Sequence, residues 1–282
     1  MKRCKVEECF FKALMIGSTV AILGSLVLIL GTVVWRGLPA LNLAMLTQTP
    51  KGGYYMGKEG GILNAIVGSL FLALGATLLA LIASLPIALY LNLYAARSRQ
   101  AELARLALDV LWGVPSIVYG AVGFTIMLWL GVRASLLGGI IALALLELPI
   151  MARGMDEAIA MTPFALKEAS FALGATRLET AWKVVVRQTA PALLTAALLA
   201  FGRGIGDAAS VLFTAGYTDR LPNSLLGPVA SLPLAVFFQL GTPFPAVKER
   251  AYASALVLTA IVLALSLISR RLAGRLTEHV IR

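Results

Sequence analysis

Six apolar runs set the strongest constraint on what this chain can fold into. The hydrocarbon core of a bilayer needs about 20 apolar residues in a helix, within a range of about 17 to 25. Each run is long enough, or nearly long enough, to cross it. The runs therefore predict an all-α integral membrane protein with six transmembrane helices. They lie at 13–35, 62–92, 115–131, 136–152, 190–213 and 251–269.

Composition and organisation agree with this class. Of the 282 residues, 59% are hydrophobic and 13% are charged, whereas soluble domains are about half apolar and about a quarter charged. The mean hydropathy is +0.88. No polar linker divides the sequence, so we expect a single membrane domain over residues 1–282. The first apolar run is longer than the roughly 7–15 residues of a signal-peptide core, so we expect a retained anchor.

The distribution of basic residues predicts the orientation. Six spans place both termini on one side, together with the loop after the second run, which contains Arg97, Arg99 and Arg105, and the loop at 153–188. These segments carry most of the lysines and arginines, so the positive-inside rule places them in the cytoplasm. The same bias accounts for much of the net charge of +10. A basic stripe interleaved with aromatic residues is missing, so we expect no nucleic-acid partner.

The sequence offers little for catalysis or for cofactors. Cys4 and Cys9 lie near the N-terminus without a histidine nearby, and the only histidine is His279. Such scattered groups do not form a metal site, and we expect reduced thiols, with lipidation as an alternative. The segment at 52–59, "GGYYMGKE", has phosphate-loop spacing but ends in Glu59 where that motif needs Ser or Thr. We find no nucleophile set and expect no enzymatic activity and no cofactor in this chain.

Proline and glycine predict kinks inside two apolar runs and a break at the start of a third. Pro86 and Pro149 lie inside apolar runs, where each removes a backbone donor and tends to kink its helix. The stretch "WGVPSIVYG" contains Gly113 and Pro115. The third span should therefore begin with a break.

The segment 162–187 has the pattern of two helices joined by a sharp corner. Thr162 followed by proline predicts a capped helix start. The helix should run to about Leu173 and stop at Gly174, as helices do before a glycine. The pair Thr176–Glu179 then has capping-box spacing and should open a second helix leading into the fifth span.

The first helix of this segment carries two kinds of face. Phe164 and Phe171 are seven residues apart and share one side, while Ala165, Ala169 and Ala172 form a stripe of small residues. Small residues allow close approach of a partner, which the phenylalanines can anchor. An interfacial helix lying on lipid headgroups gives the same pattern, so the residues alone leave both readings open.

A resemblance favours the partner. The stretch "EASFALGATRLETAWKVVV" resembles the cytoplasmic loop of permease subunits of binding-protein-dependent ABC importers, with Glu168, Ala169 and Gly174 in matching positions. Arg187 departs from that pattern, which has proline there. Further stretches resemble, in the same order, segments of the phosphate ABC-transporter permease family, A-type subunit. They lie at 60–95, 113–124, 148–158, 202–216 and 231–237.

The resemblance implies a type I ABC importer permease with a short cytoplasmic coupling helix. Its coupling loop would be 162–187, and its coupling helix would dock into a groove on a separate ATPase subunit that carries ATP and magnesium. It also implies a second permease subunit, as a homo- or heterodimer, an external phosphate-binding protein, and a place in the cytoplasmic (inner) membrane. The coupling residues implied are Phe164, Glu168, Ala169, Phe171 and Gly174.

The stretch "FGRGIGD" places two charges in the fifth run. Arg203 and Asp207 are four residues apart, so on one helix they would share a face, with Gly202 and Gly206 allowing close packing beside it. Lipid would disfavour both charges, so we expect them to face an interior. A guanidinium matches phosphate oxygens, which predicts an anion pathway in which the acid limits the affinity. A structural ion pair is the alternative.

Two charges near the end of the fourth run extend this hypothesis. Arg153 matches an arginine of the family pattern and is a second candidate for the pathway or its inner gate. A snorkelling cytoplasmic arginine is the alternative. Glu147, within the run, could be a buried neutral acid or a partner of Arg203.

Three functions remain open. The first is the permease of an ATP-driven phosphate importer, and the second is the same machine for another oxyanion such as molybdate or sulfate. The third is a secondary transporter or channel driven by ion gradients, a class that often has inverted repeats with broken helices. We see no convincing internal repeat in this sequence.

Overall fold

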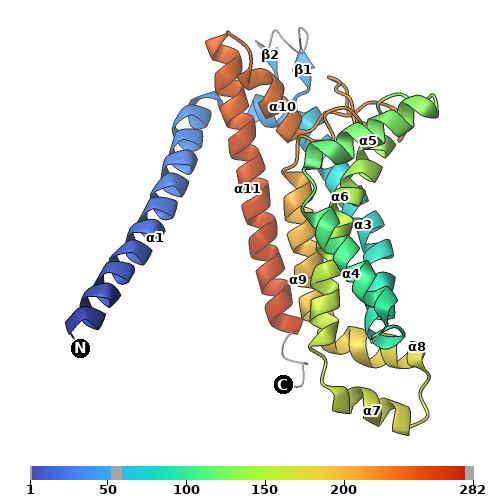
Figure 1. The fold of residues 1–282 in the computed structure, drawn as a ribbon. Helices are drawn as coiled ribbons and strands as arrows, with labels where there is room; N and C mark the ends of the chain where they lie inside the picture. Colours follow the sequence, from blue (N-terminus) through green and yellow to red (C-terminus); the bar gives the residue numbers. More distant parts are fainter. Residues whose placement is uncertain (1, 52–58, 97, 277–282) are drawn as a thin grey trace.

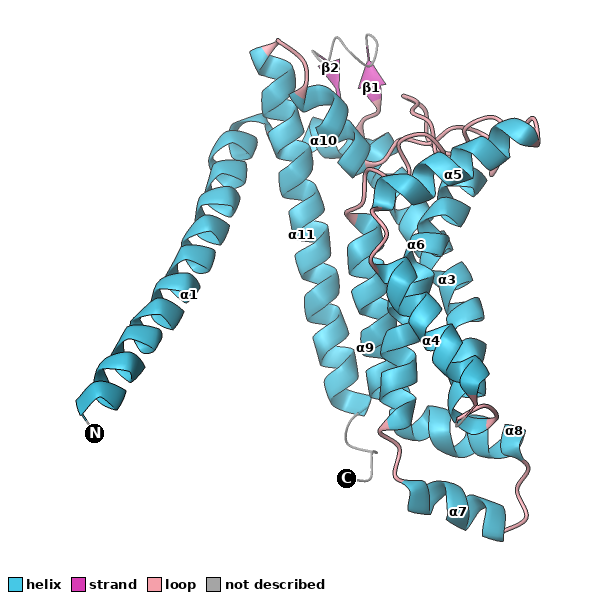
Figure 2. Ribbon diagram, viewed as in Figure 1, coloured by secondary structure: helices cyan, strands magenta, loops and turns pink. Residues whose placement is uncertain are grey.

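The computed structural model describes residues 2–51, 59–96 and 98–276. Arg97, His279 and most of the phosphate-loop-like segment at 52–59 lie outside the described residues. In the described part, strands occur only as a short antiparallel pair, β1 (Pro50–Lys51) and β2 (Glu59–Gly60). The rest is helices and their connections (Figure 2).

Five helical segments are long and apolar enough to cross a membrane, and a sixth arises if one bent pair counts as one span. The bent pair is α4 (Arg99–Trp112) and α5 (Ser116–Trp129), which meet at 98°. The break falls at residues 113–115, where Gly113 and Pro115 predicted it. The five long helices are α1 (Lys2–Gly37), α3 (Leu63–Leu93), α6 (Leu136–Ala160), α9 (Val186–Ile205), which the segment from Arg177 extends, and α11 (Pro245–Leu276).

Shorter elements connect these spans. At the end that carries β1 and β2 they include α10, and at the opposite end they include α7 and α8 (Figure 1). They are η1 (Leu38–Ala40), α2 (Leu43–Thr47), α7 (Phe164–Ala172), α8 (Arg177–Glu179), the π-helical turn η2 (Thr180–Val185) and α10 (Leu232–Leu240).

The centre of the bundle is α6, flanked by α3 and α9 (Figure 1). In the apolar window of α6, 61% of the residues are buried, compared with 39% in α3. The proline predicted to disturb each of these helices, Pro86 in α3 and Pro149 in α6, lies inside a continuous helix. The innermost element is therefore the one that carries Glu147 and Arg153.

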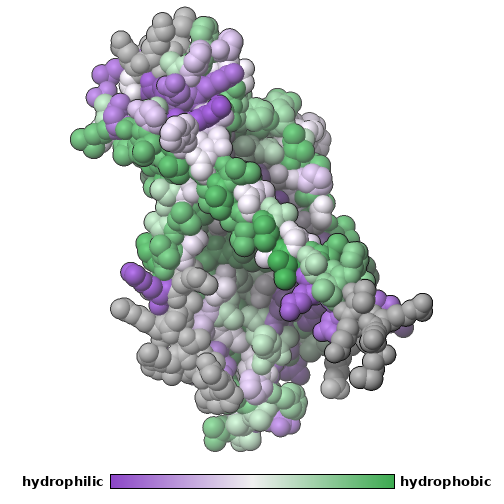
Figure 3. All heavy atoms as spheres, turned by 90° about the vertical axis from the view of Figure 1, so that its left-hand side faces the viewer, coloured by the Kyte–Doolittle hydropathy of each residue, from purple (hydrophilic) through white to green (hydrophobic). Residues whose placement is uncertain are grey.

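The outermost helix is α1, whose apolar window has no buried residue. Its last turn contacts the bundle, where Arg36 lies 5.4 Å from the ring centre of Tyr252 on α11. From this contact toward its N-terminus, α1 diverges from α11 (Figure 1). The face that carries α1 shows hydrophobic residues over its middle and hydrophilic residues toward its upper end (Figure 3). Such a surface suits lipid or another membrane subunit.

Both described chain ends, at Lys2 and Leu276, lie at the end of the molecule that carries α7 and α8 (Figure 1). The opposite end carries β1, β2 and α10. This arrangement agrees with the expectation that both termini share a side with the 162–187 segment.

Two helices extend beyond the predicted apolar runs at the end of the molecule that carries α7 and α8. The loop expected after the second span contains helix α4, which Ser98 caps by accepting the N–H of Ala101 at 3.2 Å. Helix α6 continues to Ala160 instead of ending near 152. Both extensions contain charged residues, so they could not be recognised as apolar runs. In the fold these charged residues pair with one another.

The fifth span is shorter than predicted at its other end. Helix α9 ends at Ile205 with Gly206 as its C-cap, and residues 206–231 form turns and irregular structure. Asp207 accepts the backbone N–H of Ser210 at 2.8 Å and its hydroxyl at 2.6 Å. Such local hydrogen bonds compete with a helix, and the preceding glycines weaken it further.

Candidate functional site

The segment 162–187 forms an elbow whose outer limb is α7. Its start differs from the prediction. Pro163 itself is the N-cap residue, with no side-chain capping bond, and the hydroxyl of Thr162 is buried without a hydrogen-bond partner in the described chain. Thr162 lies one residue too early for its hydroxyl to reach the free N–H groups, so the fixed φ of proline starts this helix alone.

The corner of the elbow is built as predicted. Gly174 has φ +81°, its N–H donates to Phe171 O at 2.9 Å, and Ala175 N–H donates to Ser170 O at 3.2 Å. These two bonds form a Schellman motif, which favours glycine in the left-handed position. Thr176 and Glu179 then form the predicted capping box. The chain therefore reverses within a few residues and enters the helix that becomes α9.

The inner limb of the elbow is embedded in the bundle. Ala181 and Val185 of η2 pack into a core cluster with Met155 and Ile159 of α6. Arg177 lies 5.7 Å from the ring centre of Tyr94, just after α3. The elbow therefore contacts the ends of α3, α6 and α9 together.

Helix α7 has one attached face and one free face. Its Ser170 hydroxyl lies 2.9 Å from the Thr180 hydroxyl of η2, with both residues buried. Burial also lowers the pKa of Lys167 on this side. The free face exposes Phe164 at 70% and Phe171 at 42%. The predicted coupling residues Phe164, Glu168, Ala169, Phe171 and Gly174 are all exposed.

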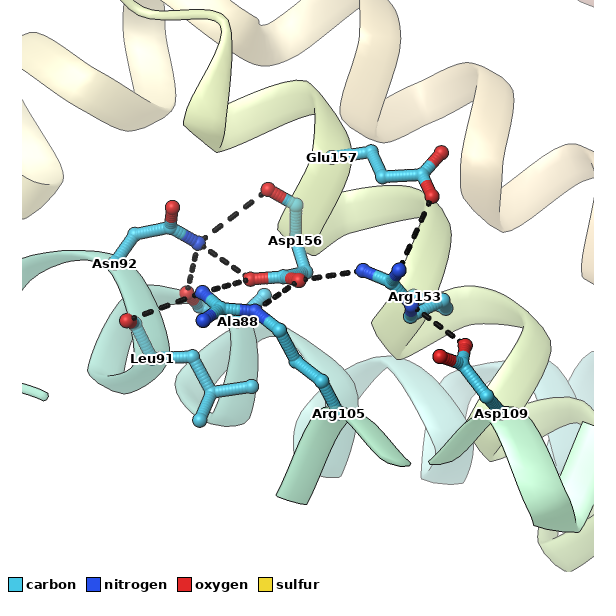
Figure 4. Close-up of polar contacts among 8 residues, drawn as sticks. All are labelled: Ala88, Leu91, Asn92, Arg105, Asp109, Arg153, Asp156 and Glu157. Atoms are coloured by element: carbon cyan, nitrogen blue, oxygen red, sulfur yellow. Dashed lines mark hydrogen bonds and ion pairs between the residues drawn. The ribbon is translucent and has the colours of Figure 1, made fainter. Parts of the chain in front are cut away.

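A second group of polar residues gathers one turn before the end of α6 (Figure 4). Its centre is Asp156, whose side chain is 3% exposed. This carboxylate accepts bonds from Arg105 Nε at 2.8 Å, Arg153 Nη1 at 2.9 Å and Asn92 Nδ2 at 2.7 Å. Asn92 lies on α3 and Arg105 on α4, so one buried charge joins three helices.

Arg153, the second candidate pathway residue, belongs to this network. Its Nε donates to Asp109 of α4 at 2.7 Å, and its Nη2 lies 3.6 Å from Glu157 on its own helix. With Asp156, three carboxylates surround one guanidinium (Figure 4). Sequence reasoning missed the network, although charges at 153, 156 and 157 on one apolar helix were a signal that it existed.

Arg203, the first candidate, has a different environment. It lies in the last turn of α9, is exposed, and lines a largely apolar cavity of about 490 Å³ between α9 and α11, whose other polar lining residues are Thr195 and Ser266. Within the described chain it forms no ion pair. No carboxylate of the described residues therefore occupies the donors of this guanidinium.

The predicted helical pair of Arg203 and Asp207 is wrong. Asp207 lies beyond the C-cap of α9, and its carboxylate accepts bonds from Ser210 instead. The two charges therefore do not share a helix face, and the register ion pair considered as an alternative does not form. Asp207 lies in the irregular segment that leads away from α9.

The predicted packing glycines are also wrong. A Cβ at Gly202 would meet nothing within 4 Å, and at Gly206 only its own helix. The close approach occurs at Gly204, where a Cβ would overlap Glu147 Oε1 and lie 2.9 Å from its Cδ. The sequence showed that glycines cluster at the end of this helix, but it did not show which glycine makes the close contact.

Glu147 is fully buried within α6. Its Oε2 accepts the hydroxyl of Thr77 on α3 at 2.8 Å, while Oε1 has no hydrogen-bond partner among the described residues. Of the two interpretations left open, pairing with Arg203 does not occur in this structure. No group of three metal-binding side chains is found in the part of the chain that was searched.

Comparisons with known proteins agree with this arrangement. Residues 84–282 match the family described as binding-protein-dependent transport system inner membrane component. The phosphate transport system permease protein PstA of Yersinia pestis is 33% identical over 245 residues, covering 87% of this chain and 82% of that protein. PstA of Haemophilus influenzae is 33% identical over 86% of this chain and 85% of its own length.

One further relative and one solved structure extend the comparison. PstA 2 of Mycobacterium tuberculosis is 30% identical over 95% of this chain and 88% of its own length. The MetNI methionine ABC transporter, solved in inward-facing conformations, contains a chain that superposes with a TM-score of 0.63, covering 77% of this chain and 96% of its own. At 18% identity this likeness concerns the fold alone. The chain therefore belongs to the binding-protein-dependent transport system inner membrane components and, within them, to the PstA-type permease proteins.

Proposed function

We propose that this chain is a membrane-spanning permease subunit of an ATP-driven importer that moves inorganic phosphate across the cytoplasmic membrane. The observation that carries the choice of phosphate is the similarity to phosphate transport system permease proteins over 86–87% of the chain. The chain itself would hydrolyse nothing. ATP and magnesium would bind to separate ATPase subunits, and an external phosphate-binding protein would deliver the anion.

Both termini and the elbow would lie in the cytoplasm. They share one end of the molecule (Figure 1), and the positive-inside rule assigns that end to the cytoplasm. We treat residues 1–282 as one transmembrane permease domain and 162–187 as the coupling loop within it. The apolar surface of α1 would face lipid or the second permease subunit, which can be a copy of this chain or a related chain.

The free face of α7 would dock into a groove on the ATPase. An amphipathic helix laid in a groove is a common recognition mode, and two exposed phenylalanines on a short helix supply apolar anchors. The opposite face is fixed to η2 by the Ser170–Thr180 contact. Closure of the ATPase dimer would then move α7, the corner at Gly174 and the base of α9 as one lever.

Phosphate would pass along a route that includes Arg203. An arginine in the membrane segment of α9 is costly unless it is solvated or paired, and its forked donors suit phosphate oxygens. The second permease subunit would complete the route on the side of the cavity between α9 and α11. Asp207 would lie at the outer mouth of this route. Arg153, the second candidate, would act at its inner end by holding α4 to α6 and would not bind the anion itself.

Reconstitution in liposomes tests the function. The chain, its ATPase, its second permease subunit and its binding protein should take up radiolabelled phosphate only when ATP is hydrolysed. Excess sulfate or molybdate should leave that uptake intact. Uptake that follows one of those oxyanions instead would support the second candidate, and uptake on an ion gradient without ATP would support a secondary transporter.

The elbow has its own test. Phe164→Arg places a charge at the proposed apolar anchor and should abolish co-purification of the ATPase with the permease. Leu226→Arg is the matched control, because Leu226 is 68% exposed and lies in the irregular 206–231 segment, outside the elbow. Retention of the ATPase by the Phe164 variant would contradict the docking proposal.

A further inference from the structure

The last turn of α9 meets α6 through one unusually close contact. Gly204 faces Glu147 so tightly that a single added carbon would overlap the carboxyl group. Gly202, one residue before Arg203, would accept the same carbon in open space. The two glycines flank the arginine, so the end of α9 has one anchored side and one free side.

Glu147 is an expensive residue for simple packing. Its side chain is completely buried, Thr77 satisfies one carboxyl oxygen, and the other has no partner among the described residues. A buried polar atom without a hydrogen bond is unfavourable, and an apolar side chain would fill the same space without that penalty. The bond from Thr77 holds the carboxyl group in place, with Oε1 directed at Gly204.

This contact determines where the neighbouring arginine points. Successive residues of an α-helix are separated by about 100° around its axis, since a turn contains about 3.6 residues. When Gly204 faces α6, Arg203 must point to another side, and it lines the cavity against α11. A rotation of the last turn by one residue would instead turn the arginine toward α6.

We propose that Glu147 is a positioning residue: with Thr77 behind it and Gly204 against it, it fixes the rotation of the last turn of α9 and so directs Arg203 into the transport route. The proposal rests on the proposed function for the role of Arg203. Its structural core, the control of Arg203 by Glu147, can be tested without phosphate.

The first measurement is a chemical one on the assembled transporter. Arg203 is replaced by cysteine, Cys4 and Cys9 by serine, and the rate of modification by a charged methanethiosulfonate reagent is followed. Gly204→Ala should change that rate severalfold, whereas the matched control Gly202→Ala should leave it close to the parent. Equal rates in the two alanine variants would overturn the proposal.

The second measurement uses paired changes. Glu147→Ala removes the atoms that the methyl group introduced by Gly204→Ala would overlap, so the double variant should be closer to the parent rate than either single variant. Glu147→Gln keeps the size and the acceptor for Thr77 and should behave as the parent alone, but should not relieve Gly204→Ala. If Gly204→Ala does not assemble, Glu147→Ala alone decides: an unchanged cysteine rate would contradict the proposal.

Transport kinetics give the functional readout with Arg203 in place. Gly204→Ala should raise the half-saturating phosphate concentration about tenfold, because displacing a positioned group by about 1 Å can cost up to about a hundredfold. Gly202→Ala should not. If the parent transports no phosphate, the proposed function fails, yet the cysteine rates still test the positioning. If the parent transports but Gly204→Ala matches Gly202→Ala in both assays, the positioning fails alone.

Discussion

Two arginines at different depths of the bundle show how different the surroundings of the same side chain can be in one fold. Arg153 lies among three carboxylates and helps join α4 to α6. Arg203 lies at the end of α9, exposed to a cavity and without an ion pair in the described part of the chain. A guanidinium whose donors are already used holds helices together, while one whose donors are free can bind a passing anion.

The comparison also separates the two ends of the route. At the end of the molecule where the described chain begins and ends, the network centred on Asp156 joins α3, α4 and α6 (Figure 4). At the other end, α9 breaks into the irregular segment 206–231 beside Arg203. The two ends are therefore joined by different means. Ion pairs and a hydrogen bond hold α3, α4 and α6 together where force would enter, whereas apolar packing and the Gly204–Glu147 contact hold the end where the anion would bind.

The largest effect should come from the centre of the network. Asp156→Asn removes the buried charge that two guanidiniums share, and should lower the free energy of unfolding by about 3 kcal/mol, the lower end for a broken buried ion pair. The lower end applies because those arginines are 25% and 21% exposed. Denaturation in detergent, followed by helical circular dichroism, measures it. An unchanged midpoint would mean that the network does not hold the helices.

A smaller effect, but one on transport, should come from Arg203. Arg203→Gln should reduce phosphate uptake about tenfold to a hundredfold, the value of a lost charge-assisted hydrogen bond of about 1.5–3 kcal/mol, while assembly with the ATPase persists. Arg203→Lys keeps the charge without the fork and should recover part of the uptake. Full uptake by the glutamine variant would remove Arg203 from the proposed route.

The smallest effect should come from the rim of the network. Glu157 is 67% exposed and its carboxylate lies 3.6 Å from Arg153. Exposed ion pairs contribute about 0–1 kcal/mol, so Glu157→Gln should leave the unfolding midpoint almost unchanged. A loss as large as that of Asp156→Asn would show that the contrast between buried and exposed partners is wrong.

Much of the fold could be predicted from the sequence, because lipid demands long apolar helices. The break at Gly113 and Pro115, the corner at Gly174 and the capping box at Thr176 follow from local backbone chemistry, which needs no knowledge of neighbours. Helix α4 and the last turns of α6 could not be predicted in this way. Their charges, such as Arg105 and Asp156, are typical of exposed loops in the sequence, and only the fold brings them together as an ion pair.

The candidate site could be predicted only in part. Residue type and spacing predicted the aromatic face of α7, which the structure shows to be exposed, while the binding roles of this face and of Arg203 stay predictions. Asp207 was misplaced because helix spacing was applied across Gly204 and Gly206, where the helix ends. The contact between Glu147 and Gly204 joins residues far apart in the sequence, so no local pattern could reveal it.

The most direct test of the account is a structure of the complete transporter trapped with phosphate between its gates. The account predicts phosphate density at hydrogen-bond distance, about 2.7–2.9 Å, from the Arg203 guanidinium, with Arg153 still held by Asp109 and Asp156. Phosphate bound instead at Arg153 in place of Asp109, with Arg203 facing acyl chains, would contradict it.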